Sequence, residues 1–439
     1  MTAEPRTLRT KAEEAIAAEF RTVRSELPGG QAALDRRDKA FALFERTGLP
    51  HRRIEAWKYT DLRALMRVAA PLAGDAEPAV LAGLLAADPF AALDRVIIVV
   101  ANGVYRPDLS DLAGLAGVTV ESLGDVLKTA PDRVGRLFED ADDPMLALNT
   151  ALMRGGVVLT IAKDATPPPI EIVHLTAAGE PAAVATRDVV EVGANAALRL
   201  VESHRGPADV AYQVNAAIEL DIGQGARVTW VRLQAESEAA QHVTSFVARL
   251  GRDATLDHLL VNAGAALSRW QAFVTAGQGI RVAFSGATML SGREHADMAL
   301  VLNHAEPHGK SRELYKSVVD GEAEGAFQGR IVVKQGAQKT DAKMMTQALL
   351  LSDRAQFAAK PELEIFADDV QCGHGATSGR IDATQMFYLM ARGIPRREAE
   401  RLLIEAFLAD AIDALGDEAI GEAFKLTVSA WLNARGGAS

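Results

Sequence analysis

The spacing of apolar residues changes twice along the chain, and the first region is helical. Between residues 9 and 48, apolar side chains recur at intervals of three and four. This spacing places them on one face of a helix. The Leu-Pro-Gly-Gly stretch at 27–30 interrupts the pattern and predicts two helices. The second helix is expected over about 31–47, with Gly48 ending it.

A short mixed region follows these helices. A helix start is expected at Thr60 or Asp61, because both side chains can cap a helix N-terminus. Residues 80–148 predict a small α/β region. Within it, the continuous apolar run over 96–101 predicts a buried strand, and the Asn-Gly pair directly after it predicts a tight turn.

From about residue 155 to 370 the pattern becomes strand-like and repetitive. Each repeat has an apolar residue, a glycine, a few small or polar residues and then an alternating strand. Four such segments occupy residues 192–200, 222–230, 250–258 and 276–284. Their first glycines are 30, 28 and 26 residues apart. A nearly constant period of this length is typical of stacked structural repeats.

Strands without intervening helices predict that these repeats stack as a β-helix, or β-solenoid. Each coil then buries its inward face only against its neighbours. An ordinary β-sandwich with glycine turns is the competing interpretation of the same pattern.

Helices return at the C-terminus. Asp382 is expected to cap a helix over 383–392. Pro395 is expected to open a longer helix over 396–415, and a last helix is expected over 417–433. These helices are more apolar than a simple cap needs. They either pack on one another or form a docking surface for a partner.

These patterns predict a mainly β protein whose solenoid core is flanked by helical domains. The expected boundaries are 1–150 for an N-terminal helical and small α/β domain, 151–380 for the β-helix core and 381–439 for a C-terminal helical domain.

Composition narrows the classes of function. The formal net charge of −11 argues against non-specific binding to nucleic acid. A single cysteine excludes an internal disulfide framework and is typical of a reducing compartment. The chain has neither a signal-type apolar run near Met1 nor an apolar stretch of about 20 residues, so a cytoplasmic protein without a membrane span is expected.

The single cysteine, Cys372, lies two residues before His374, and glycines follow both residues. Alternate residues of an extended segment point to the same face, so both side chains can aim at one spot. A thiolate and an imidazole are typical metal ligands, but a closed zinc site needs four. Any metal held here therefore needs further ligands, for which another chain is one source. A buried thiol beside a hydrogen-bonded histidine is the alternative.

Sequence motifs for other catalytic or metal-binding functions are absent or weak. The sequence has no Walker phosphate loop, no dinucleotide-binding fingerprint, no His-Glu-x-x-His and no Gly-x-Ser-x-Gly motif. His304 and His308 flank Glu306, but Pro307 makes this segment a loop rather than a helix face. A solvated turn is the favoured interpretation there.

Several longer motifs together resemble the SufB/SufD family, the scaffold subunits of the SUF machinery for iron–sulfur cluster assembly. The resemblance is dense between 310 and 410 and reappears near residue 55. The matching segments are 314–316, 327–330, 336–341, 360–365, 367–377, 385–389, Arg392-Gly393 and 55–60.

Within that family the chain is similar to SufD rather than SufB. The Glu-x-Trp-Lys-Tyr-Thr segment at 55–60 is SufD-like. Gly375 stands where SufB-like chains carry an acidic residue, and Ala348 stands where they carry a cysteine used in cluster building. These differences from SufB-like chains argue against a chain that builds a cluster alone.

The resemblance implies a non-catalytic scaffold with a right-handed parallel β-helix between helical ends. It implies pairing with a SufB-type subunit and docking of the SufC ATPase on the C-terminal helices. His374 corresponds to a family histidine at the SufB–SufD interface near the nascent iron–sulfur cluster, and Cys372 to a nearby cysteine. Reduced flavin is linked to such complexes. Isolated chains could instead form homodimers through their strand edges.

Two other functions compete with this one. The first is a purely structural docking subunit in which Cys372 and His374 are inert. The second is a carbohydrate-active β-helix enzyme, which needs carboxylates converging on a groove along the solenoid. The C-terminal helices and the single cysteine argue against the enzyme.

Overall fold

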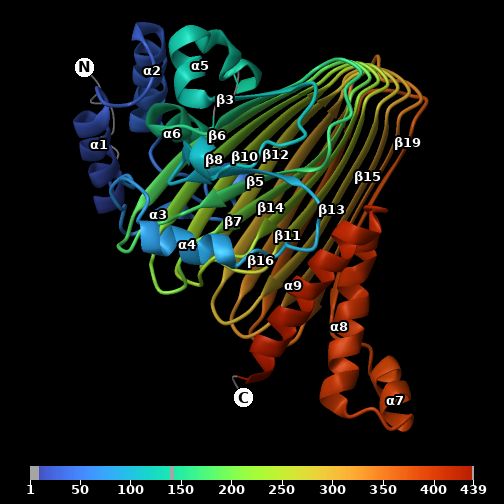
Figure 1. Cartoon of the computed structure of the whole chain (residues 1–439). Helices are drawn as coiled ribbons and strands as arrows, with labels where there is room; N and C mark the ends of the chain where they lie inside the picture. Colours follow the sequence, from blue (N-terminus) through green and yellow to red (C-terminus); the bar gives the residue numbers. More distant parts are fainter. Residues whose placement is uncertain (1–8, 139–142, 438–439) are drawn as a thin grey trace, which may run out of the picture.

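Two facing sheets wound from one continuous coil form the body of the molecule (Figure 1). The computed structural model describes residues 9–138 and 143–437. One sheet has ten strands in the order β19-β17-β15-β13-β11-β9-β7-β5-β1-β2. The other has nine, in the order β18-β16-β14-β12-β10-β8-β6-β4-β3. Odd-numbered strands from β5 onward thus lie in one sheet and even-numbered strands in the other.

From β4 and β5 to the C-terminal end of the rod, all strand pairs within each sheet are parallel. β1 also pairs in parallel with β5, whereas β2 and β3 pair antiparallel with β1 and β4. The strands of the ten-stranded sheet are β1 Val96–Ala101, β2 Val104–Tyr105, β5 Ile170–Leu175, β7 Ala197–Arg205, β9 Arg227–Gln234, β11 Thr255–Asn262, β13 Arg281–Leu290, β15 Lys310–Val319, β17 Asp341–Leu350 and β19 Gln371–Gly379. Those of the nine-stranded sheet are β3 Val118–Ser122, β4 Val157–Ile161, β6 Ala183–Val192, β8 Gln213–Ile222, β10 Gln241–Leu250, β12 Leu267–Ala276, β14 His295–His304, β16 Glu324–Val333 and β18 Gln356–Ile365.

This alternation of parallel strands between two sheets confirms the β-solenoid, and the sandwich interpretation is wrong. In the immunoglobulin-type sandwich, neighbouring strands run antiparallel. Here each strand pairs in parallel with the strand one coil later, as β10 pairs with both β8 and β12. The inward faces meet in one apolar core that includes Ile172, Leu200, Trp230, Phe246 and Leu256.

The repeated glycines lie in the turns that lead from the nine-stranded to the ten-stranded sheet, and they stack on one another. The N–H of Gly223 donates to Val192 O at 2.8 Å, and the N–H of Gly251 donates to Ile222 O at 2.8 Å. A Cβ atom at Gly223 would lie 2.8 Å from the backbone nitrogen of Ala194 in the previous coil. The period in the sequence therefore reflects the close approach of successive coils at this corner.

N-terminal helices cover the outer face of the nine-stranded sheet. Phe20, Phe41 and Phe44 pack with the outward residues Ala185 and Val243 of that sheet. The helix ending at Gly48 is confirmed, as is the helix start at Asp61, whose side chain caps Ala64. The helices of this part are α1 Lys11–Val23, α2 Gln31–Thr47, α3 Leu62–Leu65, α5 Leu123–Thr129 and α6 Pro144–Leu152. A further helix, α4 Pro78–Ala86, packs instead on the ten-stranded sheet, where Leu81 joins Val99 and Val173 in one apolar cluster.

C-terminal helices cover the opposite face. Ile404, Leu408 and Phe424 pack on outward residues of the ten-stranded sheet, such as Val231 and Leu259. Asp382 caps the first of these helices as predicted, accepting from Thr384 and Gln385 N–H. The helices are α7 Ala383–Ala391, α8 Arg396–Asp413 and α9 Glu418–Gly437, and α7 projects away from the rod at the tip of this region (Figure 1).

The segment Glu55–Thr60 joins the N-terminal region to late coils of the solenoid. Trp57 is 1 % exposed, and its indole N–H donates to Asp143 at 3.1 Å. The Arg269 guanidinium of β12 stacks over the Trp57 ring at 3.8 Å. Thr60 donates to Asp297 of β14 at 2.5 Å. These contacts fix the segment against the outer face of the nine-stranded sheet.

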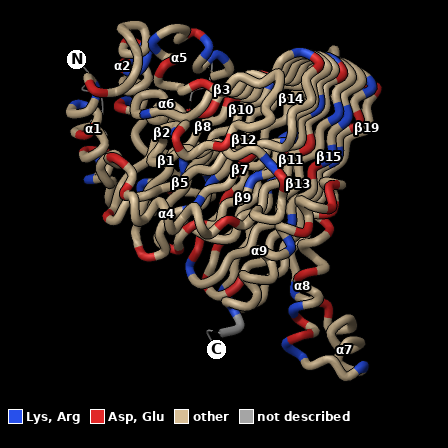
Figure 2. Tube along the Cα trace, in the orientation of Figure 1, with Lys and Arg blue, Asp and Glu red and all other residues tan. Residues whose placement is uncertain are grey.

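The three-domain division of the sequence stays a prediction. Strands β1 to β3, which precede residue 150, extend the two sheets at the N-terminal end of the rod. Along the turns of the described coils, Lys and Arg are interspersed with Asp and Glu (Figure 2). No helix in the described ranges combines the length and the apolar character needed to cross a bilayer.

Candidate functional site at the open end of the solenoid

The C-terminal end of the rod is formed by two unpaired strand edges, β18 in one sheet and β19 in the other. In β19, the N–H of Gln371 donates to Thr340 O at 2.8 Å. Backbone groups of a parallel strand alternate in direction, so the N–H groups of Cys372, His374 and Ala376 point to the free edge. Such an edge is a template for pairing with another strand.

Both predicted site residues lie on this edge strand and share its inward face. Cys372 pairs in register with Ala342, and His374 pairs with Met344, both of which face the core. Cys372 is half-buried and His374 is exposed, because no further coil covers them. The Cys-x-His spacing thus places a thiol and an imidazole at the rim of the lumen.

Exposed apolar side chains lie on the last coils at this end of the rod. Phe366 is 58 % exposed, and Ile365 and Met345 also lie at the surface. A Cβ atom at Gly375 would lie 2.7 Å from Met345 Cε, so a larger residue there would displace the methionine. Clustered exposed apolar groups on an open strand edge are typical of a protein–protein interface.

The electrostatic setting of Cys372 disfavours a free thiolate. Partial burial raises the pKa of the Cys372 thiol, and the Asp341 carboxylate acts in the same direction. A bound metal ion or a nearby cation from a partner would reverse this effect. With two donors at the rim, this end of the chain supplies only part of a metal-ligand set.

Ala348 also lies on the inward face, but it pairs in register with Ser378 rather than with Cys372 or His374. It lies on β17 between Ser317 of β15 and Ser378 of β19, and it is 3 % exposed. It carries no ligand atom, so the inward face there offers only the two serine hydroxyls.

Comparisons with known proteins agree with this geometry. A family model described as "SUF system FeS cluster assembly, SufBD core domain" matches residues 174–407. A second, "SufBD protein N-terminal region", matches residues 20–170. The chain belongs to the SufB/SufD family.

Relatives named SufD support the SufD-like assignment. The chain is 31 % identical over 381 residues to the iron–sulfur cluster assembly protein SufD of Escherichia coli, covering 85 % of this chain and 87 % of that one. It is 32 % identical over 399 residues to a SufBD family protein of Synechocystis, covering 87 % of each chain. It is also 29 % identical over 286 residues to SufD of Bacillus subtilis, covering 63 % and 64 %.

This SufB/SufD-family chain also holds a buried histidine cluster that the sequence did not predict. His174 and His204 stack with ring centroids 4.6 Å apart and planes 5° from parallel. Glu202 accepts from His204 Nε2 at 2.6 Å and from the Trp230 indole at 2.9 Å. The stack follows from register, because His174 pairs directly with His204 in neighbouring coils.

His174, Glu202 and His204 lie close enough together to share an ion, but their arrangement favours a structural role. The Arg232 guanidinium already pairs with Glu202, which places a fixed positive charge in the group. The lone pairs of the two imidazoles lie in parallel ring planes and do not converge on one ion. Burial disfavours a charge on His174, but Asp188, 3.0 Å away, outweighs this and raises the pKa of His174.

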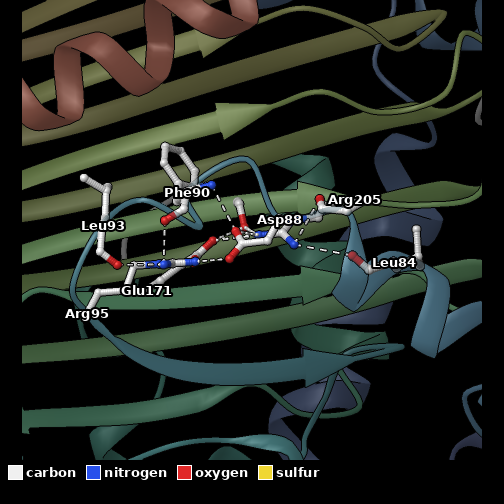
Figure 3. Close-up of polar contacts among 9 residues, drawn as sticks. Leu84, Asp88, Phe90, Leu93, Arg95, Glu171 and Arg205 are labelled. Atoms are coloured by element: carbon white, nitrogen blue, oxygen red, sulfur yellow. Dashed lines mark hydrogen bonds and ion pairs between the residues drawn. The ribbon is translucent and has the colours of Figure 1, made fainter.

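A second buried polar network fixes residues 88–95 to the outer face of the ten-stranded sheet (Figure 3). Arg95 pairs with Asp88 and with Glu171, both at 2.5 Å. Arg205 contacts the same two carboxylates at 3.1 and 3.0 Å. Two guanidinium groups neutralise two carboxylates, so the network leaves no free charge and its role is structural.

The histidine pair at 304 and 308 is separated in the structure. His304 is buried and its Nε2 lies 3.0 Å from Ser311 Oγ, whereas His308 is exposed on a turn with φ of 65°. The expected solvated turn is confirmed for His308.

One core histidine predicts an acid-sensitive fold. Burial lowers the pKa of His258 to about 3, and neither ring nitrogen has a hydrogen-bond partner. The unfolded chain takes up a proton below its pKa of about 6.5, whereas the folded chain does not, so this contribution to stability is lost as pH falls below that value.

We expect His258→Phe to reduce this acid sensitivity. Relative to wild type, the variant should gain about 2 kcal/mol of stability between pH 7 and pH 5. Denaturant unfolding followed by circular dichroism at the two pH values measures the difference. Parallel pH profiles for the two proteins would contradict the assignment.

Proposed function

We propose that this chain is a non-catalytic SufD-like scaffold subunit that pairs with a SufB-type subunit through its open solenoid end. His374, with Cys372 as a second candidate ligand, contributes to the interface where an iron–sulfur cluster forms. The cluster is cargo shared with the partner and is not a resident cofactor. The open end carries the proposal, because it combines an unpaired strand edge with an exposed imidazole.

The ligand chemistry fits iron and sulfide. Thiolate and imidazole ligands suit iron–sulfur clusters and their precursors. Two donors on one chain leave room for donors from the facing chain, so the site is complete only in the complex. Separation of the two chains then releases the cargo, and ATP-driven movement of a partner can control that separation.

The C-terminal helices fit the docking of a SufC-type ATPase. Phe387 is 73 % exposed and Tyr388 is 55 % exposed on α7, beyond the part of the helical region that packs on the sheet. A groove of about 460 Å³ lies beside α7 and is lined by Met386, Met390 and Leu351, among others. An apolar patch on a projecting helix is typical of a docking surface.

Two parts of the proposal depend on family membership alone. A cytoplasmic location is expected for a chain of this family with one thiol. A role for reduced flavin would concern the assembled complex, and it stays a prediction.

The test replaces His374 by alanine in a chain co-expressed with SufB-type and SufC-type partners. We expect the complex to assemble at wild-type stoichiometry but to lose most of its bound iron and sulfide, measured after anaerobic purification. His308→Ala is the matched control, because His308 is also exposed but lies on the turn between β14 and β15 rather than on the edge strand.

A purely structural docking subunit is the alternative, and the same experiment separates the two. Wild-type iron and sulfide content in a Cys372→Ala, His374→Ala double variant would establish the structural role. Loss of the complex itself would show that these side chains contribute to pairing rather than to ligation.

A further inference from the structure

A buried carboxyl group lies two coils beneath the open rim. Glu313 of β15 is 3 % exposed and faces the core. In register it lies beside Met344 of β17, which in turn lies beside His374 of β19. One coil therefore separates Glu313 from the rim.

Glu313 differs from the other buried acids in the described residues. Each of those accepts at least one hydrogen bond, as Glu171 does from Arg95 and Ser203. Neither oxygen of Glu313 has a hydrogen-bond partner. A buried polar atom without a partner costs free energy, and the cost is largest for a group that can carry charge. Burial accordingly raises the pKa of Glu313 to about 8.

Two further unpaired oxygens accompany this carboxyl group. Tyr315 and Thr346 pair in register on β15 and β17 and face inward, and both are completely buried. The Tyr315 hydroxyl and Thr346 Oγ1 also have no partner. The Tyr315 ring lies over Gly286, where a Cβ atom would be 2.6 Å away, and packs 4.8 Å from Phe327. Four unsatisfied oxygens, two of them on Glu313, thus lie on facing positions of two adjacent strands inside the lumen.

We propose that Glu313, with Tyr315 and Thr346, forms an interior binding site for a divalent transition-metal ion. A carboxylate and hydroxyl oxygens suit such an ion, and its charge compensates a carboxylate that no protein cation reaches. The site is separate from the His174 cluster, where Arg232 already supplies a positive charge.

The coil above the site can act as its entrance. It presents Ala342, Met344 and Thr346 to the lumen, between the rim and Glu313. Methionine is flexible and its thioether is a soft ligand, so Met344 can move aside or contact the ion as it passes. That the ion is ferrous iron rests on the proposed function; the existence of the site does not.

Binding of Mn²⁺ to the full-length chain tests the site, with electron paramagnetic resonance detecting free Mn²⁺. We expect Glu313→Gln to lose one bound Mn²⁺ per chain. Glu294→Gln should keep it, because Glu294 is also buried with a raised pKa but accepts from Ser291 N–H. Absence of bound Mn²⁺ in the wild type, or equal binding by Glu313→Gln, would overturn the proposal.

Three further measurements keep the test decisive. Glu313→Gln removes a buried acid, so it should fold and resist denaturant better than wild type at pH 8. Thr346→Val, which keeps the side-chain shape, should weaken Mn²⁺ binding if the hydroxyl is a ligand, and unchanged binding would remove Thr346 from the site. His374→Ala should keep the Mn²⁺ ion; cluster assembly that survives His374→Ala would refute the proposed function while leaving this inference intact.

Discussion

Replacing Trp57 by alanine is expected to destabilise the attachment of residues 49–66 by about 3–5 kcal/mol, which is the usual cost of truncating a buried tryptophan. The variant loses the indole packing in the N-terminal core, the hydrogen bond to Asp143 and the stacking of Arg269. It also leaves the buried Asp143 and Arg269 without these contacts, which adds to the cost.

Limited trypsin digestion measures this effect locally. Arg52, Lys58 and Arg63 lie in the segment, so release of the segment exposes new cleavage sites. Tyr59→Ala is the matched control, since the Tyr59 ring is partly exposed and lies outside the tryptophan's contacts. Equal resistance of Trp57→Ala and wild type to digestion would show that the segment is held by other contacts.

Introducing proline at Ala376 is expected to abolish pairing with a SufB-type subunit while leaving the chain folded. The N–H of residue 376 points to the free edge of β19, whereas the neighbouring N–H groups of Gly375 and Thr377 pair with β17. Proline removes the free-edge donor and places its ring where a partner strand would lie. The ladder between β19 and β17 keeps its hydrogen bonds.

Size-exclusion chromatography of this chain co-expressed with the SufB-type subunit measures whether the two form a complex. Ala376→Val is the control, because valine keeps the N–H and favours a strand. Circular dichroism should show that both variants retain the solenoid. A stable complex with Ala376→Pro would place the partner interface elsewhere on the molecule.

Much of the rod could be predicted from the sequence because its cause is local. Glycines at 193, 223, 251 and 277 mark a corner where successive backbones nearly touch. The Cys-x-His spacing places both side chains on one face of a strand whatever the fold. After residue 277, Ala305, Lys334 and Phe366 continue the same hydrogen-bond ladder without glycine, so the period fades in the sequence although the coils continue.

Contacts set by register between distant strands could not be predicted in this way. The stacking of His174 on His204 and the column Glu313–Met344–His374 require the number of residues in each coil, and the coils differ in length. The role of Trp57 could not be predicted from the sequence for a similar reason. Its partners Asp143 and Arg269 lie 86 and 212 residues away in the sequence, and nothing local relates them.

Alkylation of Cys372 is the most direct test of the claim that the open end meets a partner. The chain has one cysteine, so no background substitutions are needed, and peptide mass spectrometry separates its signal from those of the partners. Because its pKa is raised, the reaction is best run above pH 8. We predict that Cys372 reacts in the dilute free chain and is protected in the complex with a SufB-type subunit. Equal reactivity in the free chain and the complex would contradict this account.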